Sequence, residues 1–99
     1  MSARVVHCKR DPFDVYIGRA NPRAGLAGSK FANPFKLPSN ASDTERQACI
    51  ERYETWLRAR PELVEAAQRD LRGKVLGCWC APKACHGDVL VRITAEARS

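Results

Sequence analysis

The stretch KVLGCWCAPKACHGD, Lys74 to Asp88, holds three of the chain's five cysteines and one of its two histidines. From Lys74 to Cys80 the side chains alternate with the period of two that a strand requires, and both resulting faces are largely apolar. Ala81-Pro82 interrupts this pattern, and Asp88 suits the first turn of a helix. We therefore predict a strand inside a sheet, then a tight loop, then a helix N-terminus.

The segments before this stretch supply the other elements. Two short β-prone runs, Val5 to Cys8 and Val15 to Ile17, are typical of strands. A capping-box pattern, Ser-Asp-Thr-Glu, begins at Ser42 and predicts a helix start. A second helix is expected from Pro61 to Gly73, since proline suits a first turn and glycine an end. The predicted order is strand, strand, long loop, helix, helix, strand, turn, helix.

This order indicates an α/β fold. We expect a small sheet of about three or four strands, at least partly parallel, with about three helices packed on it, Rossmann-like in character. Ninety-nine residues suit one small core, and no internal repeat is visible, so residues 1–99 are predicted to form a single domain. In the first helix Cys49, Tyr53 and Leu57 share one face, and we interpret Cys49 as a core residue.

Composition restricts location and partners. No apolar run is long enough to cross a bilayer, and the first twelve residues contain no continuous apolar segment of the signal-peptide type. We expect a cytoplasmic protein without membrane contact, in which clustered cysteines are metal-binding, reactive or buried rather than cross-linked. The net charge of +6 favours an anionic partner, namely a small molecule, a nucleotide or nucleic acid. The alternative is that arginine is simply abundant on solvated helix faces.

Three interpretations of the cysteine-rich stretch compete. In one, a thiol in an anion-binding or catalytic loop reacts, with Cys80 or Cys85 as the reactive group and His86 and Asp88 as acid, base or hydrogen-bonding partners. In another, Cys78, Cys80, Cys85 and His86 bind zinc, although C-x-C and an adjacent Cys-His depart from the usual C-x-x-C pairs. In the third, the cysteines only pack, which we prefer for Cys78 inside the strand.

Four segments carry a resemblance: VYIGR at Val15 to Arg19, SKFANPF at Ser29 to Phe35, YETWL at Tyr53 to Leu57 and LRGKVLGCWCAPKACHGDVL at Leu71 to Leu90. Together they resemble an uncharacterised family of bacterial and phage domains, domain of unknown function family 4326. The resemblance spans most of the chain. It implies a shared fold and brings no established activity with it.

The resemblance also groups segments that are far apart in the chain. The segment after the second strand, the Gly- and Pro-rich loop and the cysteine-rich loop would meet at one sheet edge if the two strands are parallel neighbours. The candidate ligand-binding residues are Tyr16, Gly18, Arg19, Ser29, Lys30 and Asn33. Arg19 and Lys30 would neutralise phosphate. The Ser29 hydroxyl and the Asn33 amide would bind a base or sugar.

The favoured hypothesis is a pocket for a nucleotide-like or otherwise phosphorylated ligand. Base modification, glycosidic-bond cleavage and group transfer are all compatible with these residues, so no reaction is preferred. The alternative is a non-catalytic module, stabilised by zinc, that binds nucleic acid or a protein partner through its basic surface.

Overall fold

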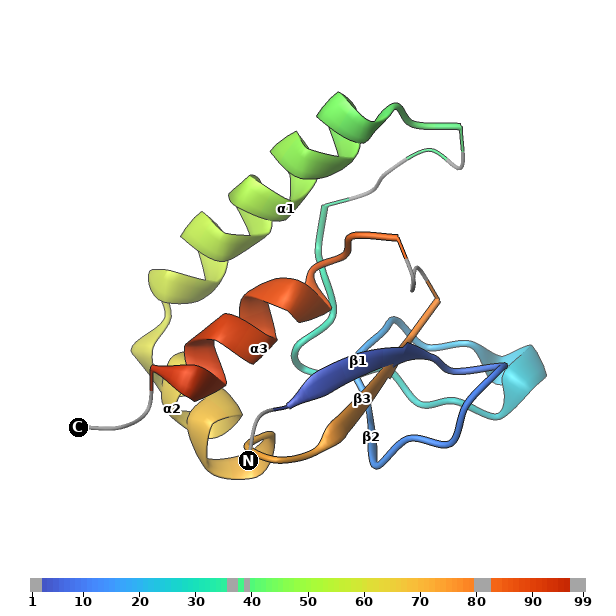
Figure 1. The fold of residues 1–99 in the computed structure, drawn as a ribbon, viewed down its shortest axis with the longest axis horizontal. Coiled ribbons are helices and arrows are strands. Elements are labelled where there is room, and N and C mark those ends of the chain that lie inside the picture. The colour runs from blue at the N-terminus through green and yellow to red at the C-terminus, as the bar shows by residue number, and fades with distance from the viewer. Residues whose placement is uncertain (1–2, 36–37, 39, 80–82, 97–99) are drawn as a thin grey trace.

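The computed structural model describes residues 3–35, 38, 40–79 and 83–96 (Figure 1). Its elements follow the predicted order. The strands are β1 (Arg4–His7), β2 (Val15–Tyr16) and β3 (Val75–Cys78), and the α-helices are α1 (Asp43–Arg58), α2 (Pro61–Asp70) and α3 (Gly87–Ala95). A short 3-10 helix, η1 (Pro22–Ala24), lies in the long loop.

The sheet has the order β1-β3-β2, and both strand pairs are parallel. The prediction that the strand of the cysteine-rich stretch lies inside the sheet is confirmed. Val5 of β1 and Val15 of β2 both lie opposite Leu76. Because the strands run the same way, all three carboxyl ends lie along one edge of the sheet.

The link between β1 and β2 is short for two parallel strands that both pair with β3. It must return from the carboxyl edge to the amino edge, and it does so across β3. Phe13 lies against Gly77, where an added Cβ would come within 2.6 Å of the phenyl ring. Gly77 therefore leaves the space through which this link crosses the sheet. The Asp14 carboxylate then accepts a hydrogen bond from the Val75 backbone N–H at 2.8 Å.

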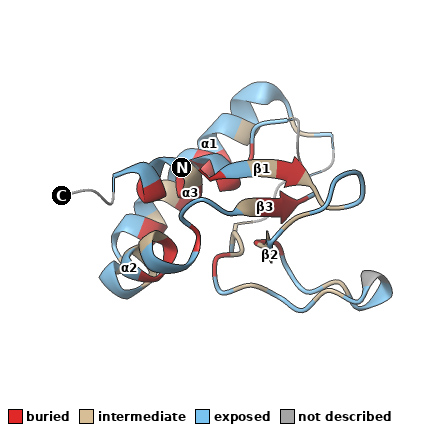
Figure 2. Cartoon of the chain, turned by 60° about the horizontal axis from the view of Figure 1, so that its bottom comes forward, coloured by how far each residue is buried: buried red, intermediate tan, exposed pale blue. Residues whose placement is uncertain are grey.

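All three α-helices lie on one side of the sheet (Figures 1 and 2). The buried residues lie on the helices and on the strands that they cover (Figure 2), and the largest fully buried ones are Ile17, Tyr53, Leu57, Leu71, Leu76, Val89, Leu90 and Ile93. The fold is thus a small two-layer α/β domain, as the predicted class requires. A Rossmann-like character is not established, since that arrangement covers both faces of the sheet with helices.

The start of α1 is fixed by the predicted capping box. Ser42 Oγ accepts a hydrogen bond from the Glu45 N–H at 3.1 Å, and the Glu45 carboxylate accepts one from the Ser42 N–H at 2.8 Å. These two bonds satisfy donors that a helix start otherwise leaves to water. After α2, Gly73 has a φ of 73°, the left-handed conformation that favours glycine.

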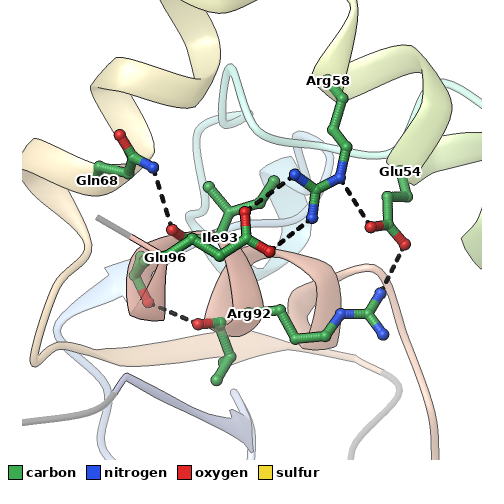
Figure 3. Close-up of polar contacts among 8 residues, drawn as sticks. Glu54, Arg58, Gln68, Arg92, Ile93 and Glu96 are labelled. Atoms are coloured by element: carbon green, nitrogen blue, oxygen red, sulfur yellow. Dashed lines mark hydrogen bonds and ion pairs between the residues drawn. The ribbon is translucent and has the colours of Figure 1, made fainter. Parts of the chain in front are cut away.

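Polar contacts join the helices outside the core (Figure 3). Arg58 of α1 donates two parallel hydrogen bonds to Glu96, at 3.0 and 2.9 Å, and a third to Glu54 at 2.8 Å. Arg92 of α3 reaches the other oxygen of Glu54 at 2.7 Å. This ion-pair cluster of Glu54, Arg58, Arg92 and Glu96 links α1 to α3 and to the residue that caps the C-terminus of α3.

The long loop packs against the helices through Phe31. The Phe31 ring is buried, and its carbonyl accepts a hydrogen bond from the hydroxyl of the fully buried Tyr53 at 2.6 Å. The loop is also tied to the sheet, because the Ser29 N–H donates to the Gly18 carbonyl at 3.0 Å. In the part of the chain that the structure describes, no helix is long and apolar enough to span a membrane.

Candidate functional site

A pocket of about 360 Å³ lies at the carboxyl edge of the sheet. We call it the carboxyl-edge pocket. Its described lining residues come from the ends of β2 and β3, the long loop, the first half of α1 and the start of α3. They are Tyr16, Gly18, Arg19, Ala20, Asn21, Asn33, Phe35, Arg46, Cys49, Ile50, Cys78, Trp79, Cys85 and His86.

His86 connects the start of α3 to the end of β2. Its Nε2 lies 2.8 Å from the Ile17 carbonyl oxygen, and its ring meets Tyr53 edge-on at 5.0 Å between centroids. A carbonyl oxygen only accepts, so Nε2 carries the hydrogen and donates it. Any proton transfer by this imidazole would therefore use Nδ1.

Two thiols lie together beside His86. The Sγ atoms of Cys78 and Cys85 are 3.2 Å apart, and both residues are buried. Cys85 Sγ also accepts a hydrogen bond from the Gly87 N–H at 3.2 Å. Because the first N–H groups of a helix carry partial positive charge, this position favours a thiolate. A side chain at Gly87 would crowd this place, since an added Cβ would lie 2.8 Å from a Val5 methyl group and 2.9 Å from an Ile17 methyl group.

Cys49 of α1 contributes a third thiol to the described lining. It is buried, as its helical spacing predicted, and it packs next to the loop as well as the core. The Asn33 amide donates to its sulfur at 3.5 Å, and the sulfur lies 3.7 Å from the Phe35 carbonyl oxygen. Helical spacing indicates only that Cys49 faces inward, so the sequence did not indicate that it borders a pocket.

Two arginines give the pocket a positive character. Arg19 donates from Nε and Nη2 to the Asn33 carbonyl, at 3.1 and 2.9 Å, which fixes the plane of its guanidinium. Arg46 reaches the pocket from the first turns of α1, and its Nη1 lies 3.5 Å from the Ala84 carbonyl. Among the described lining residues there is no Asp or Glu to offset these charges.

Trp79 forms an aromatic wall at the end of β3. It is 37% exposed, and its indole N–H donates to the Tyr16 hydroxyl at 2.7 Å. That hydroxyl in turn donates to the Arg19 carbonyl at 2.6 Å. A tyrosine hydroxyl ordinarily keeps its proton at neutral pH and so can make this second bond, and burial raises the pKa of Tyr16 further. The chain of hydrogen bonds holds Trp79 over the segment that carries Arg19.

The structure brings together most of the residues that the sequence proposed for a site. Those in the lining are Tyr16, Gly18, Arg19, Asn33, Cys78, Cys85 and His86. Cys80 lies outside the described residues. The lining residues that the sequence analysis did not propose include Asn21, Phe35, Arg46, Cys49, Ile50 and Trp79.

Three proposed residues have other contacts and do not line the pocket. Ser29 Oγ accepts a hydrogen bond from the Phe31 N–H at 3.0 Å. Lys30 lies 3.9 Å from the Asp70 carboxylate and 5.5 Å from the Phe31 ring centre. The Asp88 carboxylate accepts a hydrogen bond from the Cys85 N–H at 3.2 Å, so it holds the start of α3.

Of the residues predicted to bind zinc, the structure describes Cys78, Cys85 and His86. Within residues 3–35, 38, 40–79 and 83–96, no group of three or more His, Cys, Asp or Glu side chains is placed to hold a metal ion. The sulfur atoms of Cys78 and Cys85 lie side by side, whereas Nε2 of His86 is hydrogen-bonded to the Ile17 carbonyl. The fourth predicted ligand, Cys80, is not described, so zinc binding stays a prediction.

Comparison with known proteins agrees with the resemblance seen in the sequence. The model of a family described as Domain of unknown function (DUF4326) matches residues 3–96. The chain belongs to this family. A relative is the uncharacterized 12.4 kDa protein in the nrdA-td intergenic region of Enterobacteria phage T4, which is 32% identical over 93 residues. The match covers 91% of this chain and 75% of the phage protein. No solved structure matches the chain.

Proposed function

We propose that this DUF4326 domain binds a small phosphorylated ligand of the nucleotide type in the carboxyl-edge pocket. The observation that carries the proposal is the pairing of Arg19 and Arg46 in a lining whose described part has no carboxylate. Guanidinium groups bind phosphate oxygens through charge-assisted, often bidentate hydrogen bonds. The position also fits, since ligands of parallel α/β sheets bind beyond the carboxyl ends of the strands.

The size of the pocket and its aromatic wall favour a single nucleotide over a nucleic-acid chain as the ligand. The volume of about 360 Å³ is near the lower end of small-molecule pockets, which run from roughly 300 to 1,000 Å³. Trp79 offers a partly exposed ring on which a base can stack. The anion would then lie towards the arginines and the base towards Trp79.

The polar contacts within the lining assign a role to Asn33. Its backbone carbonyl holds the Arg19 guanidinium, while its side-chain oxygen accepts a hydrogen bond from the Phe35 N–H at 2.9 Å. The amide of Asn33 is therefore used to shape the loop. In this proposal it positions Arg19 and does not read the base. A guanidinium has five N–H donors, so Arg19 keeps three for a ligand.

The same pocket carries groups suited to chemistry on a bound ligand. Cys85 is the nucleophile that the geometry favours, because the Gly87 N–H and the start of α3 stabilise its thiolate. His86 would transfer a proton through Nδ1. Asp88 would act indirectly, by holding the backbone of Cys85.

Binding can be tested by thermal shift and calorimetry with three probes: a nucleoside monophosphate, the matching nucleoside and inorganic phosphate. We expect the monophosphate to stabilise the protein most, because it uses both the arginines and Trp79. Arg46→Gln should weaken its binding about tenfold or more, the effect of losing a hydrogen bond to a charged group. Arg72→Gln is the matched control, since Arg72 is exposed and does not line the pocket.

Two results would overturn this proposal. One is that no nucleoside monophosphate, whatever its base, raises the melting temperature. The other is that Arg46→Gln and Arg72→Gln bind the monophosphate with equal affinity. The alternative, a zinc-stabilised module that binds nucleic acid or protein, predicts instead about one zinc per chain by elemental analysis. A nucleic-acid interface would also show affinity that falls steeply with salt.

A further inference from the structure

Two thiols that lie in contact connect elements that are separate in sequence. Cys78 is the last residue of β3, and Cys85 lies just before α3. Their sulfur atoms are 3.2 Å apart, whereas a disulfide needs about 2.05 Å. A shift of roughly 1.1 Å would therefore bring them to bonding distance.

We propose that Cys78 and Cys85 form a reversible disulfide when a hydroperoxide enters the carboxyl-edge pocket. Both residues line this pocket, so it is the side from which a molecule as small as hydrogen peroxide would approach the two largely buried sulfur atoms. The inference goes beyond ligand binding. It rests on the sulfur geometry and holds whether or not the pocket binds a nucleotide.

The reaction balances with hydrogen peroxide as the only oxidant. The thiolate of one cysteine attacks an oxygen of the O–O bond, which breaks, and a sulfenic acid and hydroxide form. The second sulfur attacks the sulfenic sulfur, the S–S bond forms and water leaves. In sum, two thiols lose two electrons and two protons, and one peroxide becomes two waters. An external dithiol reverses the change by thiol–disulfide exchange.

The other described thiols are less suited to this reaction. Cys49 Sγ lies next to the Phe35 carbonyl and the Asn33 amide, and among the described residues no other thiol makes a hydrogen-bonding contact with it. Cys8 is only partly buried, but no other thiol of the described chain makes a hydrogen-bonding contact with it, so it has no described partner for an internal disulfide. Cys8 and Cys49 thus serve as internal controls for selectivity.

A disulfide here would change the pocket in two ways. It would tie the end of β3 to Cys85, two residues before α3, across the lining beside His86. It would also consume the Cys85 thiol, so any chemistry that uses this nucleophile would stop until the bond was reduced. The pair is therefore a modification site placed within the binding site.

The test is peroxide treatment of the folded, reduced protein, followed by alkylation of the remaining thiols and trypsin digestion. Cleavage after Lys74, Lys83 and Arg92 gives peptide 75–83, with Cys78 and Cys80, and peptide 84–92, with Cys85. We expect the two peptides to be joined, with the loss of two hydrogens, and to separate on treatment with dithiothreitol. Cys8 and Cys49 should remain alkylated.

Fragment ions of the joined wild-type peptides show whether Cys78 or Cys80 is the partner, without any substitution. Cys80→Ser should keep the joined product, and Cys78→Ser should replace it with sulfinic or sulfonic acid at Cys85. A bond from Cys85 to Cys80 would overturn the proposal, as would a bond inside peptide 75–83. Oxidation of Cys8 or Cys49 before any joined product appears would also overturn it.

Discussion

Tyr53 shows how one side chain can hold a loop, a helix and a candidate site together. It is fully buried on α1, and its hydroxyl donates to the Phe31 carbonyl at 2.6 Å. Its ring supports His86 edge-on. Removing the hydroxyl would leave a carbonyl without this donor, which costs more than the loss of an exposed bond.

We predict that Tyr53→Phe lowers the free energy of unfolding by about 1–3 kcal/mol, the cost of an unsatisfied buried polar group. Tyr16→Phe is the matched control. Its hydroxyl also donates to a backbone carbonyl, that of Arg19, but the bond is exposed to solvent. Urea denaturation of the two variants compares the costs, and an equal or larger loss for Tyr16→Phe would contradict this account.

Tyr53 also predicts how stability depends on alkaline pH. Burial raises its pKa well above the ordinary value of 10.0, and the nearby Cys85 acts in the same direction. The unfolded chain loses this proton near pH 10 while the folded chain keeps it, so the unfolded state binds fewer protons above that pH. The contribution of Tyr53 to the free energy of unfolding is therefore complete below about pH 10 and is lost as the pH rises further.

We therefore expect the free energy of unfolding to fall above about pH 10 and to fall less steeply in Tyr53→Phe. Denaturation curves from pH 8 to 11 measure both slopes. Identical slopes in the wild type and the variant would show that Tyr53 is not the group responsible.

At the scale of elements, the start of α1 matters most for the site. This helix carries Arg46 and Cys49 to the pocket from the two turns after its capping box. Ser42 and Glu45 make reciprocal bonds, so each side chain depends on the other. Fraying of these turns would move Arg46 away from the proposed anion site.

Ser42→Ala should destabilise the protein by about 1 kcal/mol, the usual cost of losing an N-cap. Combining Glu45→Ala with Ser42→Ala should cause little further loss of stability, because the two substitutions remove the same reciprocal contact. Thr44→Ala, at an exposed position of the same turn, is the control and should be close to neutral. Fully additive losses for Ser42→Ala and Glu45→Ala would argue that the capping box does not act as a unit.

The sequence could predict these elements because each has a local signal. The capping box at Ser42 and the apolar alternation in β3 both depend on near neighbours in the chain. The crossing of the β1–β2 link over Gly77 has no such signal, since a glycine in a strand can mark a bulge, a bend or the close approach of another segment. Only the tertiary contact with Phe13 explains it.

The candidate site was predictable to the extent that its residues cluster in sequence. Cys85 and His86 stand in an unusual stretch, so their type and density indicated function. Arg46 and Cys49 lie on an ordinary amphipathic helix, whose spacing tells which face is inward but not that a pocket borders it. Lys30 looked equivalent to Arg19 in sequence, yet it lies against Asp70 and Phe31 outside the lining.

At the scale of the whole molecule, the ion-pair cluster joins α1 to α3 outside the core (Figure 3). Its side chains are part-exposed, from 28% for Glu54 to 56% for Arg92, so water and salt weaken each pair. The bidentate bond between Arg58 and Glu96 is the strongest contact in the cluster by geometry.

We expect Arg58→Gln to lower the free energy of unfolding by about 1 kcal/mol or less at low salt. The loss should shrink in about 1 M sodium chloride, where the screening length is only about 3 Å. Arg69→Gln is the control, because Arg69 pairs with its sequence neighbour Asp70 and joins no elements. A loss of the same size at both salt concentrations would mean that Arg58 acts by packing and not by charge.

The central claim, that the carboxyl-edge pocket binds a nucleotide-like anion, is tested most directly by amide chemical shifts in a ¹⁵N-labelled sample titrated with a nucleoside monophosphate. We predict shifts that saturate together at residues 16–21, 33, 35, 46–50, 78–79 and 85–87, and smaller ones in Arg46→Gln at the same ligand concentration. Unchanged spectra, or shifts confined to residues 65–74, from the second half of α2 to the start of β3, would contradict the claim.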